Sequence, residues 1–416
     1  MIKKSFMEKL LDGVAVEWKA LKEIAIKISS GGTPKTGVSE YYNGDIPWLR
    51  TQEVNFGEIW DTGVKITEAG LKTSSAKWIP ANCIIIAMYG ATVGKIGINK
   101  IPMTTNQACA NIGIDENIAN YRYVFHFLYS KYEYIKSLGT GSQTNINAAI
   151  VKEIQIPIPC PDNPEKSLKI QAEIVRILDA FTELTTELTT ELTTELGLRK
   201  KQYNYYRDQL LSFEEGTTKD TKSTKGVEWK TLGEALVRTK GTSITAGKMK
   251  EFHKDGAPLK IFAGGKTTAF VNYEDIPFNN INREPSIIVK SRGNIEFEYY
   301  DKPFSHKNEM WSYHTKDKNI NIKFIYYFLK TKEIYFQNIA GKMQMPQIAT
   351  PDTEKFKVPL PPIEKQNSIV TILDKFDALT NSITEGLPRE IELRQKQYEY
   401  YRDLLLSFPA QGESHG

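Results

Sequence analysis

A stretch of 15 residues occurs twice in this chain, and its repetition decides how the rest is organised. The sequence RKKQYNYYRDQLLSF at residues 199–213 returns as RQKQYEYYRDLLLSF at residues 394–408, with 12 of the 15 positions identical at an offset of 394 − 199 = 195. At the same offset, QAEIVRILDAF at 171–181 matches QNSIVTILDKF at 366–376. Chance does not produce such matches, so the chain is a tandem duplication.

Each copy follows a segment of more divergent sequence. VEWKALKEI from Val16 resembles VEWKTLGEA from Val227, at an offset of 227 − 16 = 211, so the halves differ by 211 − 195 = 16 residues between these landmarks. A chain of 416 residues is long enough for about two to four domains. We predict globular segments at 1–160 and 227–361, helical segments at 161–213 and 362–408, a polar linker at 214–226 and a disordered tail at 409–416.

The two helical segments have the periodicity of long paired helices. The first follows a proline-rich entry and has no interior proline, and about 44 helical residues would span roughly 66 Å. Pro388, shortly after Gly386, should kink or restart the second helix. A three-four spacing of apolar and aromatic residues predicts a stripe that pairs the helices or binds another subunit, although burial against the helix's own globular segment is the alternative. The predicted stripe comprises Leu184, Leu188, Leu192, Leu196, Tyr203, Tyr206, Leu210 and Phe213 in the first copy, and Leu379, Ile383, Ile391, Tyr398, Tyr401, Leu405 and Phe408 in the second.

A four-residue unit is repeated inside the first helical segment. Residues 182–196 read TELTTELTTELTTEL, whereas the second copy has apolar residues at the equivalent positions but lacks the TELT sequence. One unit adds about 6 Å of helix and rotates the later part of the helix by roughly 40°. We therefore expect the number of units to set the spacing and phase between the globular segments. A solvated low-complexity helix without such an effect is the alternative.

The globular segments predict mixed short strands with a helix near each end, because short isoleucine-rich runs stand between glycine, proline and asparagine. Polar and aromatic side chains gather in their glycine-containing loops. Arg, Lys, Asn and Gln are the side chains that contact base edges and phosphates of DNA, although any one of them alone is more often a solvated loop residue. The DNA-binding candidates are Lys35, Arg50, Gln52, Tyr89, Lys95, Asn106, Gln107, Gln143 and Asn145 in the first half, and Lys266, Lys290, Arg292, His306, Lys307, Asn308, Lys342 and Gln344 in the second.

The composition excludes several classes of protein. A net charge of +4 permits an acidic partner but does not require one. The three cysteines form no C-x-x-C pair and the five histidines show no ligand spacing, so we expect no metal site. No apolar run approaches the roughly 18 residues of a membrane span, and the N-terminus lacks the apolar core of a signal peptide, so we expect a cytoplasmic protein.

Enzyme motifs are incomplete wherever they are suggested. DNPE at Asp162 lacks the second proline and the aromatic residue that an adenine methyltransferase needs to hold a flipped base. GGKT at 264–267 ends like a phosphate loop, but Lys260 stands where the first glycine is required. PDTEK at 351–355 places its acid and lysine side by side, whereas a nuclease site needs them one residue apart. We expect no catalytic residue in this chain.

The motifs taken together resemble the specificity subunit of type I restriction-modification systems. The resemblance rests on SGGTPKT followed by IPWLRTQEV, on GATVGKIGI and NQA, on ILDAF, and on the twin KQYxYYRDxLLSF ends, and it covers nearly the whole chain. It implies an α+β fold in which two target recognition domains are separated by two long helices that form an antiparallel coiled coil with pseudo-twofold symmetry. The second half opens with TKGTSITAGKMK in place of the GGTPKT motif, which departs from the pattern of the first half.

The resemblance also implies partners. Each recognition domain would read one half of a split target in double-stranded DNA, and two methylation subunits and the restriction subunits would dock on the helices. S-adenosylmethionine, ATP and Mg would belong to those subunits, with no cofactor in this chain and no membrane partner. Two alternatives are a stand-alone bipartite DNA-binding regulator and a self-sufficient modification enzyme. Matched apolar positions on both helical ends argue against the regulator, which would not need docking surfaces.

Overall fold

The computed structural model describes residues 13–139, 145–214, 226–265, 267–341, 346–382 and 384–409. The chain divides into two compact units, of which the first comprises Met1–Glu191 with Ile391–Gly416 and the second comprises Leu192–Glu390. Each unit contains one globular domain and part of the long helices. Most of the predicted linker and tail, namely residues 215–225 and 410–416, lies outside the described residues.

The described residues of the first unit's globular domain form three sheets. The first and last strands, β1 (Val16–Ala20) and β10 (Gln155–Pro159), pair antiparallel and close the domain. The five-stranded sheet has the order β2 (Ala25–Ser30), β9 (Cys109–Ile114), β6 (Ile84–Ala87), β7 (Ile96–Asn99) and β4 (Glu58–Ile59). The three-stranded sheet has the order β5 (Lys65–Ile66), β3 (Tyr42–Leu49) and β8 (Thr104–Thr105). The helices are α2 (Leu21–Ile24), α3 (Glu68–Lys72), α4 (Tyr121–Ser130), α5 (Tyr132–Ser137) and α6 (Ala148–Lys152), with 3-10 turns at Ser39–Tyr41 and Thr51–Glu53.

The second globular domain repeats this plan. Strands β11 (Glu228–Thr231) and β19 (Lys357–Leu360) close it in antiparallel fashion. Its larger sheet has the order β12 (Val237–Thr239), β18 (Trp311–His314), β15 (Ser286–Lys290) and β16 (Glu296–Tyr300). Its smaller sheet has the order β14 (Thr268–Val271), β13 (Leu259–Phe262) and β17 (Phe304–His306). The helices are α8 (Leu232–Ala235), α9 (Ala246–Phe252), α10 (Ile322–Thr331), α11 (Glu333–Ile339) and α12 (Thr350–Glu354), with 3-10 turns at Tyr273–Asp275 and Phe278–Asn280.

The two domains therefore share one topology, apart from β4, which adds a fifth strand to the larger sheet of the first domain. In both, the central strand of the smaller sheet pairs parallel with one neighbour and antiparallel with the other, as β3 and β13 do. In both, a buried central strand has apolar side chains on its two faces. Ile84 and Ile86 of β6 belong to one core and Ile85 to another, because successive side chains of a strand point to opposite faces. The expected mixture of short strands and helices is confirmed.

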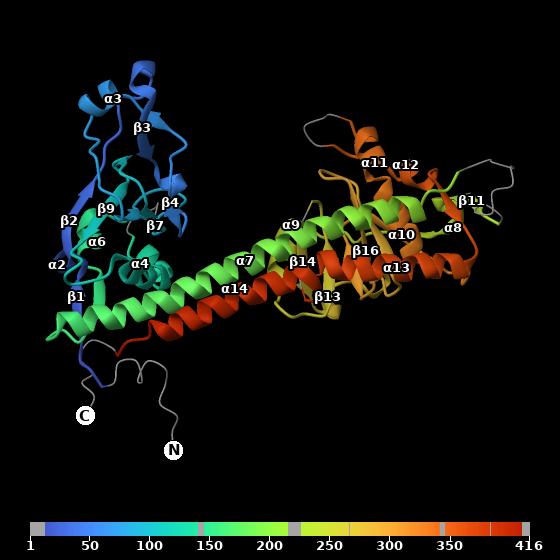
Figure 1. Ribbon diagram of the computed structural model, residues 1–416. Coiled ribbons are helices and arrows are strands. Elements are labelled where there is room, and N and C mark those ends of the chain that lie inside the picture. The colour runs from blue at the N-terminus through green and yellow to red at the C-terminus, as the bar shows by residue number, and fades with distance from the viewer. Residues whose placement is uncertain are drawn as a thin grey trace. The chain divides into compact units, whose positions relative to one another are not determined.

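Long helices follow each globular domain along the chain (Figure 1). The first, α7 (Pro164–Leu210), is continuous over 47 residues and contributes to both units. The second copy forms two helices, α13 (Ile363–Asn381) and α14 (Gly386–Leu405), so the restart predicted from Pro388 is confirmed, with the new helix beginning two residues before it. Pro388 is the third residue of α14, within the first turn, where its missing N–H leaves no hydrogen bond unmade.

Candidate nucleic-acid interface and helix scaffold

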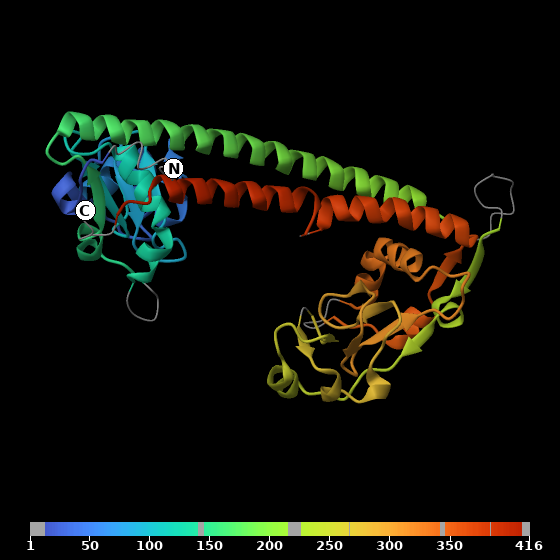
Figure 2. The same ribbon diagram turned by 90° about the horizontal axis from the view of Figure 1, so that it is seen from below.

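The long helices pair through the same aromatic contact in each unit. In the first unit the Phe181 ring stacks on Tyr401, with centroids 5.6 Å apart and an interplanar angle of 14°. In the second unit Tyr206 stacks on Phe376 at 5.9 Å and 28°. At the offset of 195, Phe181 corresponds to Phe376 and Tyr206 corresponds to Tyr401. Both contacts therefore join the same two repeat positions, and each copy supplies the phenylalanine in one contact and the tyrosine in the other. This exchange requires antiparallel helices, and α7 lies alongside α13 and α14 in both views (Figures 1 and 2).

A repeated aspartate fastens each globular domain to its long helix. Asp179 of α7 accepts hydrogen bonds from Nε and Nη2 of Arg122 at 2.8 and 2.9 Å and lies 2.8 Å from Nε2 of His126. Its equivalent, Asp374 of α13, pairs with Lys323 at 2.8 Å and accepts from the Tyr327 hydroxyl at 2.6 Å. In each domain the two donors lie one turn apart at the start of the same helix, α4 or α10.

The electrostatics of these clusters depend on partial burial. Burial alone would raise the pKa of Asp179, but the hydrogen bonds from His126 and Arg122 lower it below its ordinary value. The pKa of Tyr327 is raised, first by burial and then by its hydrogen bond to the Asp374 carboxylate. The first cluster is therefore held as an ion pair and the second as an ion pair with a neutral phenol.

A repeated glutamine makes a second attachment. Oε1 of Gln171 accepts a hydrogen bond from the backbone N–H of Asn120 at 2.8 Å, and Oε1 of Gln366 accepts from Asn321 at 2.9 Å. Both glutamines are buried, and both asparagines cap the N-terminus of the helix that carries the aspartate's donors. Sequence reasoning missed these anchors. The available clue was that the glutamine and the aspartate are polar residues identical in both copies.

The predicted stripe divides into pairing positions and positions that pack on the globular domains. Tyr398 lies 3.0 Å from the Thr182 hydroxyl across the helix pair, and Tyr203 contacts the ring of Phe376. Leu405 is buried in the first domain's core, and Phe408 packs against the same core. Leu210 and Phe213 pack on the second core. These four positions fit neither interpretation, because each packs on the globular domain that does not precede its own helix in the chain.

The repeat leucines are less buried than a pairing seam requires. Leu184 is 51% exposed, while Leu188, Leu192, Leu196, Leu379 and Ile391 are half-buried. Tyr206 and Tyr401 remain 40% and 38% exposed despite their ring contacts. Ile383 lies outside the described residues.

A second, outward-facing set of apolar residues is also repeated. Leu198 and Tyr205 are 56% and 58% exposed, and their equivalents Leu393 and Tyr400 are 42% and 64% exposed. Sequence reasoning missed this set, although Leu393 and Tyr400 keep the identities of Leu198 and Tyr205. Helix pairing does not explain these identities, because the side chains face solvent. We call these four residues the repeated outer face.

The candidate DNA-binding loops of the first domain are joined to one another by hydrogen bonds. The Thr33 hydroxyl bonds to Gln107, and the Asn106 N–H donates to the carbonyl of Leu49, next to Arg50. The Thr92 hydroxyl donates to the carbonyl of Thr51 at 2.8 Å. The N–H of Ile146, next to Asn145, donates to the carbonyl of Met88 at 3.0 Å. Loops that are far apart in sequence therefore form one connected surface.

The candidate side chains of this surface differ in how far they are exposed and in whether a neighbouring polar group holds them. Lys35, Gln52, Tyr89 and Gln107 are exposed, whereas Arg50, Lys95, Asn106 and Asn145 are half-buried. Arg50 lies 3.3 Å from the Glu53 carboxylate, and Lys95 donates to Oδ1 of Asn55 at 2.8 Å. Gln143 lies outside the described residues.

In the second domain the structure corrects two candidates. Lys290 is 8% exposed and pairs with Glu296 at 2.6 Å and Glu298 at 2.8 Å, so its ammonium is neutralised inside the domain. His306 is fully buried and lies 3.1 Å from the Ser312 hydroxyl, and burial lowers its pKa. Neither side chain is placed to reach a partner, because both lie on strands whose side chains face the core.

Three further candidates of the second domain lie among the described residues, at or near the surface. Arg292 and Asn308 are exposed, and half-buried Lys307 pairs with Glu309 at 2.8 Å. The loop of Arg292 is joined to the chain before α12, since the N–H of Gly293 donates to the carbonyl of Pro346 at 2.9 Å. Lys266, Lys342 and Gln344 lie outside the described residues.

No group of three or more metal-ligating side chains is found in the part of the chain that the structure describes. Among these residues, no helix is both long enough and apolar enough to cross a membrane.

Residues 14–198 and 239–393 match the sequence family described as the type I restriction modification DNA specificity domain. The chain is 38% identical over 427 aligned positions to the type I restriction enzyme EcoR124I/EcoR124II specificity subunit of Escherichia coli, with 98% of each chain covered. It is 36% identical to the EcoprrI specificity subunit of Escherichia coli, with 92% of each chain covered. The chain belongs to the family of type I restriction-modification specificity subunits. The resemblance inferred from its motifs is thus confirmed.

Solved structures support the fold of this specificity subunit. A chain from a study of complex assembly and conformational transition of the type I restriction-modification system superposes with a TM-score of 0.64 at 16% identity, covering 94% of this chain and 97% of the other. The specificity subunit from M. genitalium superposes with a TM-score of 0.50 at 16% identity, covering 96% and 98%. The α+β fold of two recognition domains and paired long helices is confirmed.

Proposed function

We propose that this specificity subunit reads a bipartite target in double-stranded DNA and holds methylation and restriction subunits together. The observation that carries this proposal is the duplication of contacts. Each unit attaches a domain of the same topology through an equivalent glutamine, an equivalent aspartate and an equivalent ring pair. Two readers attached in the same way suit a target with two specified halves.

The connected loops of the first domain supply the chemistry for reading DNA. Exposed Gln52 and Gln107 offer amides that can bond to adenine or to phosphate, and Lys35 offers a cation for the backbone. Arg50 and Lys95 are held by neighbouring polar groups, which positions them before DNA arrives. In the second domain Arg292, Lys307 and Asn308 would act in the same way.

The repeated outer face fits two copies of one partner. Exposed apolar side chains are unfavourable in water unless a partner covers them, and identical residues in both copies suit identical partners. We assign these partners as the two methylation subunits, with the restriction subunits joining the assembly. Catalysis, S-adenosylmethionine, ATP and Mg would belong to those subunits, and the assembly would act in the cytoplasm.

The test is to express the chain with the methylation and restriction subunits of its own system and to map methylated adenines by sequencing. We expect one bipartite motif that is lost when this chain is omitted. The double variant Tyr205→Asp, Tyr400→Asp should keep its fold and lose assembly, whereas the matched double variant Lys201→Asp, Lys396→Asp on the same helices should retain more of it. A stand-alone regulator would behave differently, because it would bind its site equally well without the other subunits.

A further inference from the structure

In both globular domains an exposed side chain lies just beyond an inner strand of the larger sheet. The second residue after β6 is Tyr89, and the second residue after β15 is Arg292; both are exposed. The next residue is a glycine with positive φ in each domain, +84° at Gly90 and +76° at Gly293. Glycine adopts this conformation without strain, so the chain turns at the same point after both strands.

A second segment runs beside each turn and is bonded to it through the backbone. In the first domain the N–H of Ile146 donates to the carbonyl of Met88 at 3.0 Å. In the second domain the N–H of Ile348 donates to the carbonyl of Ser291, also at 3.0 Å. The residue before each donor is polar. In the second domain this residue is Gln347, which is exposed and which sequence reasoning did not single out.

A third segment contributes an exposed amide in each domain. The N–H of Asn106 donates to the carbonyl of Leu49 at 2.9 Å. The N–H of Lys307 donates to the carbonyl of Phe262 at the same distance. The next residue carries the exposed amide in both cases. Equivalent backbone positions thus present different side chains, and the three pairs are Tyr89 with Arg292, Gln107 with Asn308, and half-buried Asn145 with Gln347.

The three side chains of the second domain are available to a ligand. Within the described part of the chain, no hydrogen bond or ion pair engages the side chains of Arg292, Asn308 and Gln347. Burial would raise the pKa of the nearby Glu309 carboxyl, but the hydrogen bond from Lys307 and the charges of Lys307 and Arg292 lower it. Two cations therefore accompany one carboxylate, and this group of residues keeps a net positive charge that attracts DNA.

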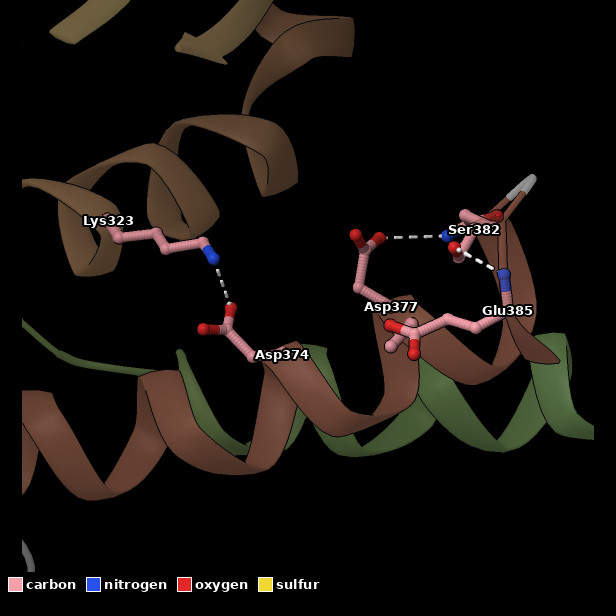
Figure 3. A pocket seen from close by; sticks show the side chains of 7 residues that line it. Lys323, Asp374, Asp377, Ser382 and Glu385 are labelled. Carbon is pink, nitrogen blue, oxygen red and sulfur yellow. Dashed lines mark hydrogen bonds and ion pairs between the residues drawn. The ribbon is translucent and has the colours of Figure 1, made fainter. Parts of the chain in front are cut away.

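A cavity in the same unit has the opposite charge. It has a volume of about 440 Å³ and lies between α10 and the end of α13 (Figure 3). Among the described residues that line it, the carboxylates of Asp374, Asp377 and Glu385 accompany the ammonium of Lys323. DNA phosphates would be repelled there, so the turn of Arg292 is the better place for DNA to approach this domain.

The chemistry of these side chains selects particular bases. A guanidinium forms two hydrogen bonds to O6 and N7 of guanine, and a side-chain amide forms two to N6 and N7 of adenine. A contact between Arg292 and a phosphate would serve any DNA sequence equally well. It would not explain why Tyr89, which carries no charge and cannot form the same pair of bonds, occupies this backbone position in the first domain.

We propose that Arg292 reads a guanine in the second half of the DNA target and that Gln347 reads an adenine in an adjacent base pair. The two residues form an antiparallel β-bridge, which places their side chains next to each other on one face. Tyr89 and Asn145 give the first domain a different preference from the same backbone. The inference rests on the proposed function and deepens it, because it assigns bases to particular side chains.

The test measures the affinity of the complex of this chain with its methylation subunits for duplexes that carry its mapped target. Each G·C pair of the second half-site is replaced in turn by A·T. One replacement should weaken binding by the parent about 5- to 150-fold. Arg292→Gln should abolish or reverse the preference at that pair only, because an amide suits adenine. Gln347→Ala should relax an adjacent A·T pair and leave the G·C pair as it was.

Lys302→Gln is the matched control, since it removes an exposed cation from the same domain and should change no single base preference. The melting temperature of Arg292→Gln should equal that of the parent, because the side chain is exposed. If Arg292→Gln weakened all duplexes by one factor, Arg292 would be a phosphate contact and the proposal would be overturned. Unchanged preferences at every G·C pair would overturn it too. In both cases the parent keeps its bipartite target, whereas a parent complex without such a target would refute the proposed function itself.

Discussion

Replacing Asp179 with alanine should release helix α4 from α7 and loosen the first domain without affecting the second. Asp179 is the acceptor for both Nε and Nη2 of Arg122, and it is the partner of His126. Its removal leaves Arg122 with Glu58 alone. It also leaves the imidazole of His126, which is 2% exposed, without its partner at Nε2.

The magnitude depends on the number and exposure of these contacts. Hydrogen bonds to charged groups contribute about 1.5–3 kcal/mol when buried. The Asp179 side chain is 33% exposed, so solvent screening reduces the sum of its three contacts. We expect a net loss of about 2–3 kcal/mol in the local opening free energy of α4, which corresponds to roughly 30- to 150-fold faster exchange.

Hydrogen–deuterium exchange followed by mass spectrometry would measure the local opening of α4 and α10 peptide by peptide. Amides of α4 should exchange faster in Asp179→Ala, and amides of α10 should not change. The matched variant Asp374→Ala should do the reverse with a smaller effect of about 1–2 kcal/mol, because Asp374 has two partners and its side chain is 38% exposed. Glu173→Ala, which removes an exposed ion pair with Arg176, serves as a control with little effect. Unchanged α4 exchange in Asp179→Ala would refute the view that this aspartate holds the domain.

The pH dependence provides an independent check on the same residue. The folded-state pKa of Asp179 lies below its unfolded value of about 3.9, so its stabilising contribution is present above that value and is lost as the pH falls through the folded pKa. Protection of α4 should therefore decline below about pH 4 in the parent. Asp179→Asn should lack this component and show a flatter acid profile.

Three further predictions concern function. The purified chain should neither methylate nor cleave DNA, and methyl transfer by the chain without other subunits would contradict this. Replacing residues 17–160 by the equivalent segment of a relative should change one half of the target only, since each mismatched base pair costs about 1–3 kcal/mol where it is read; methylation mapping that shows both halves altered would mean that the domains read jointly. Deleting one TELT unit, residues 186–189, should shorten the unspecified gap between the two half-sites by one base pair. The unit contributes about 6 Å of helix, which is at most nearly two base-pair rises, and the helix pair need not follow the DNA axis. An unchanged gap in the same methylation mapping would show that the repeat does not set the spacing.

The duplication could be found from the sequence alone because the helical segments carry their own constraints. Ring pairs, buried leucines and the anchoring polar residues must all recur wherever a domain is attached to a long helix, so residues 171–213 and 366–408 remained similar. The restart of the second helix was equally local, since Gly386 and Pro388 act through their own backbone restrictions. For these features neighbouring residues hold enough information.

The shared topology of the two globular domains was decided only in the tertiary structure. Strands such as β3 and β13 match in their pairing but not in their residues, because many apolar sequences satisfy the same sheet. Burial of Lys290 and His306 was likewise invisible, since a loop-like sequence does not reveal which side chain meets a carboxylate or a hydroxyl across a sheet. Sequence periodicity predicted the helices and their apolar stripe. It did not predict which stripe residues pair the helices, which pack on the globular domains and which face outward. That depends on contacts between residues some 200 positions apart, such as Phe181 with Tyr401.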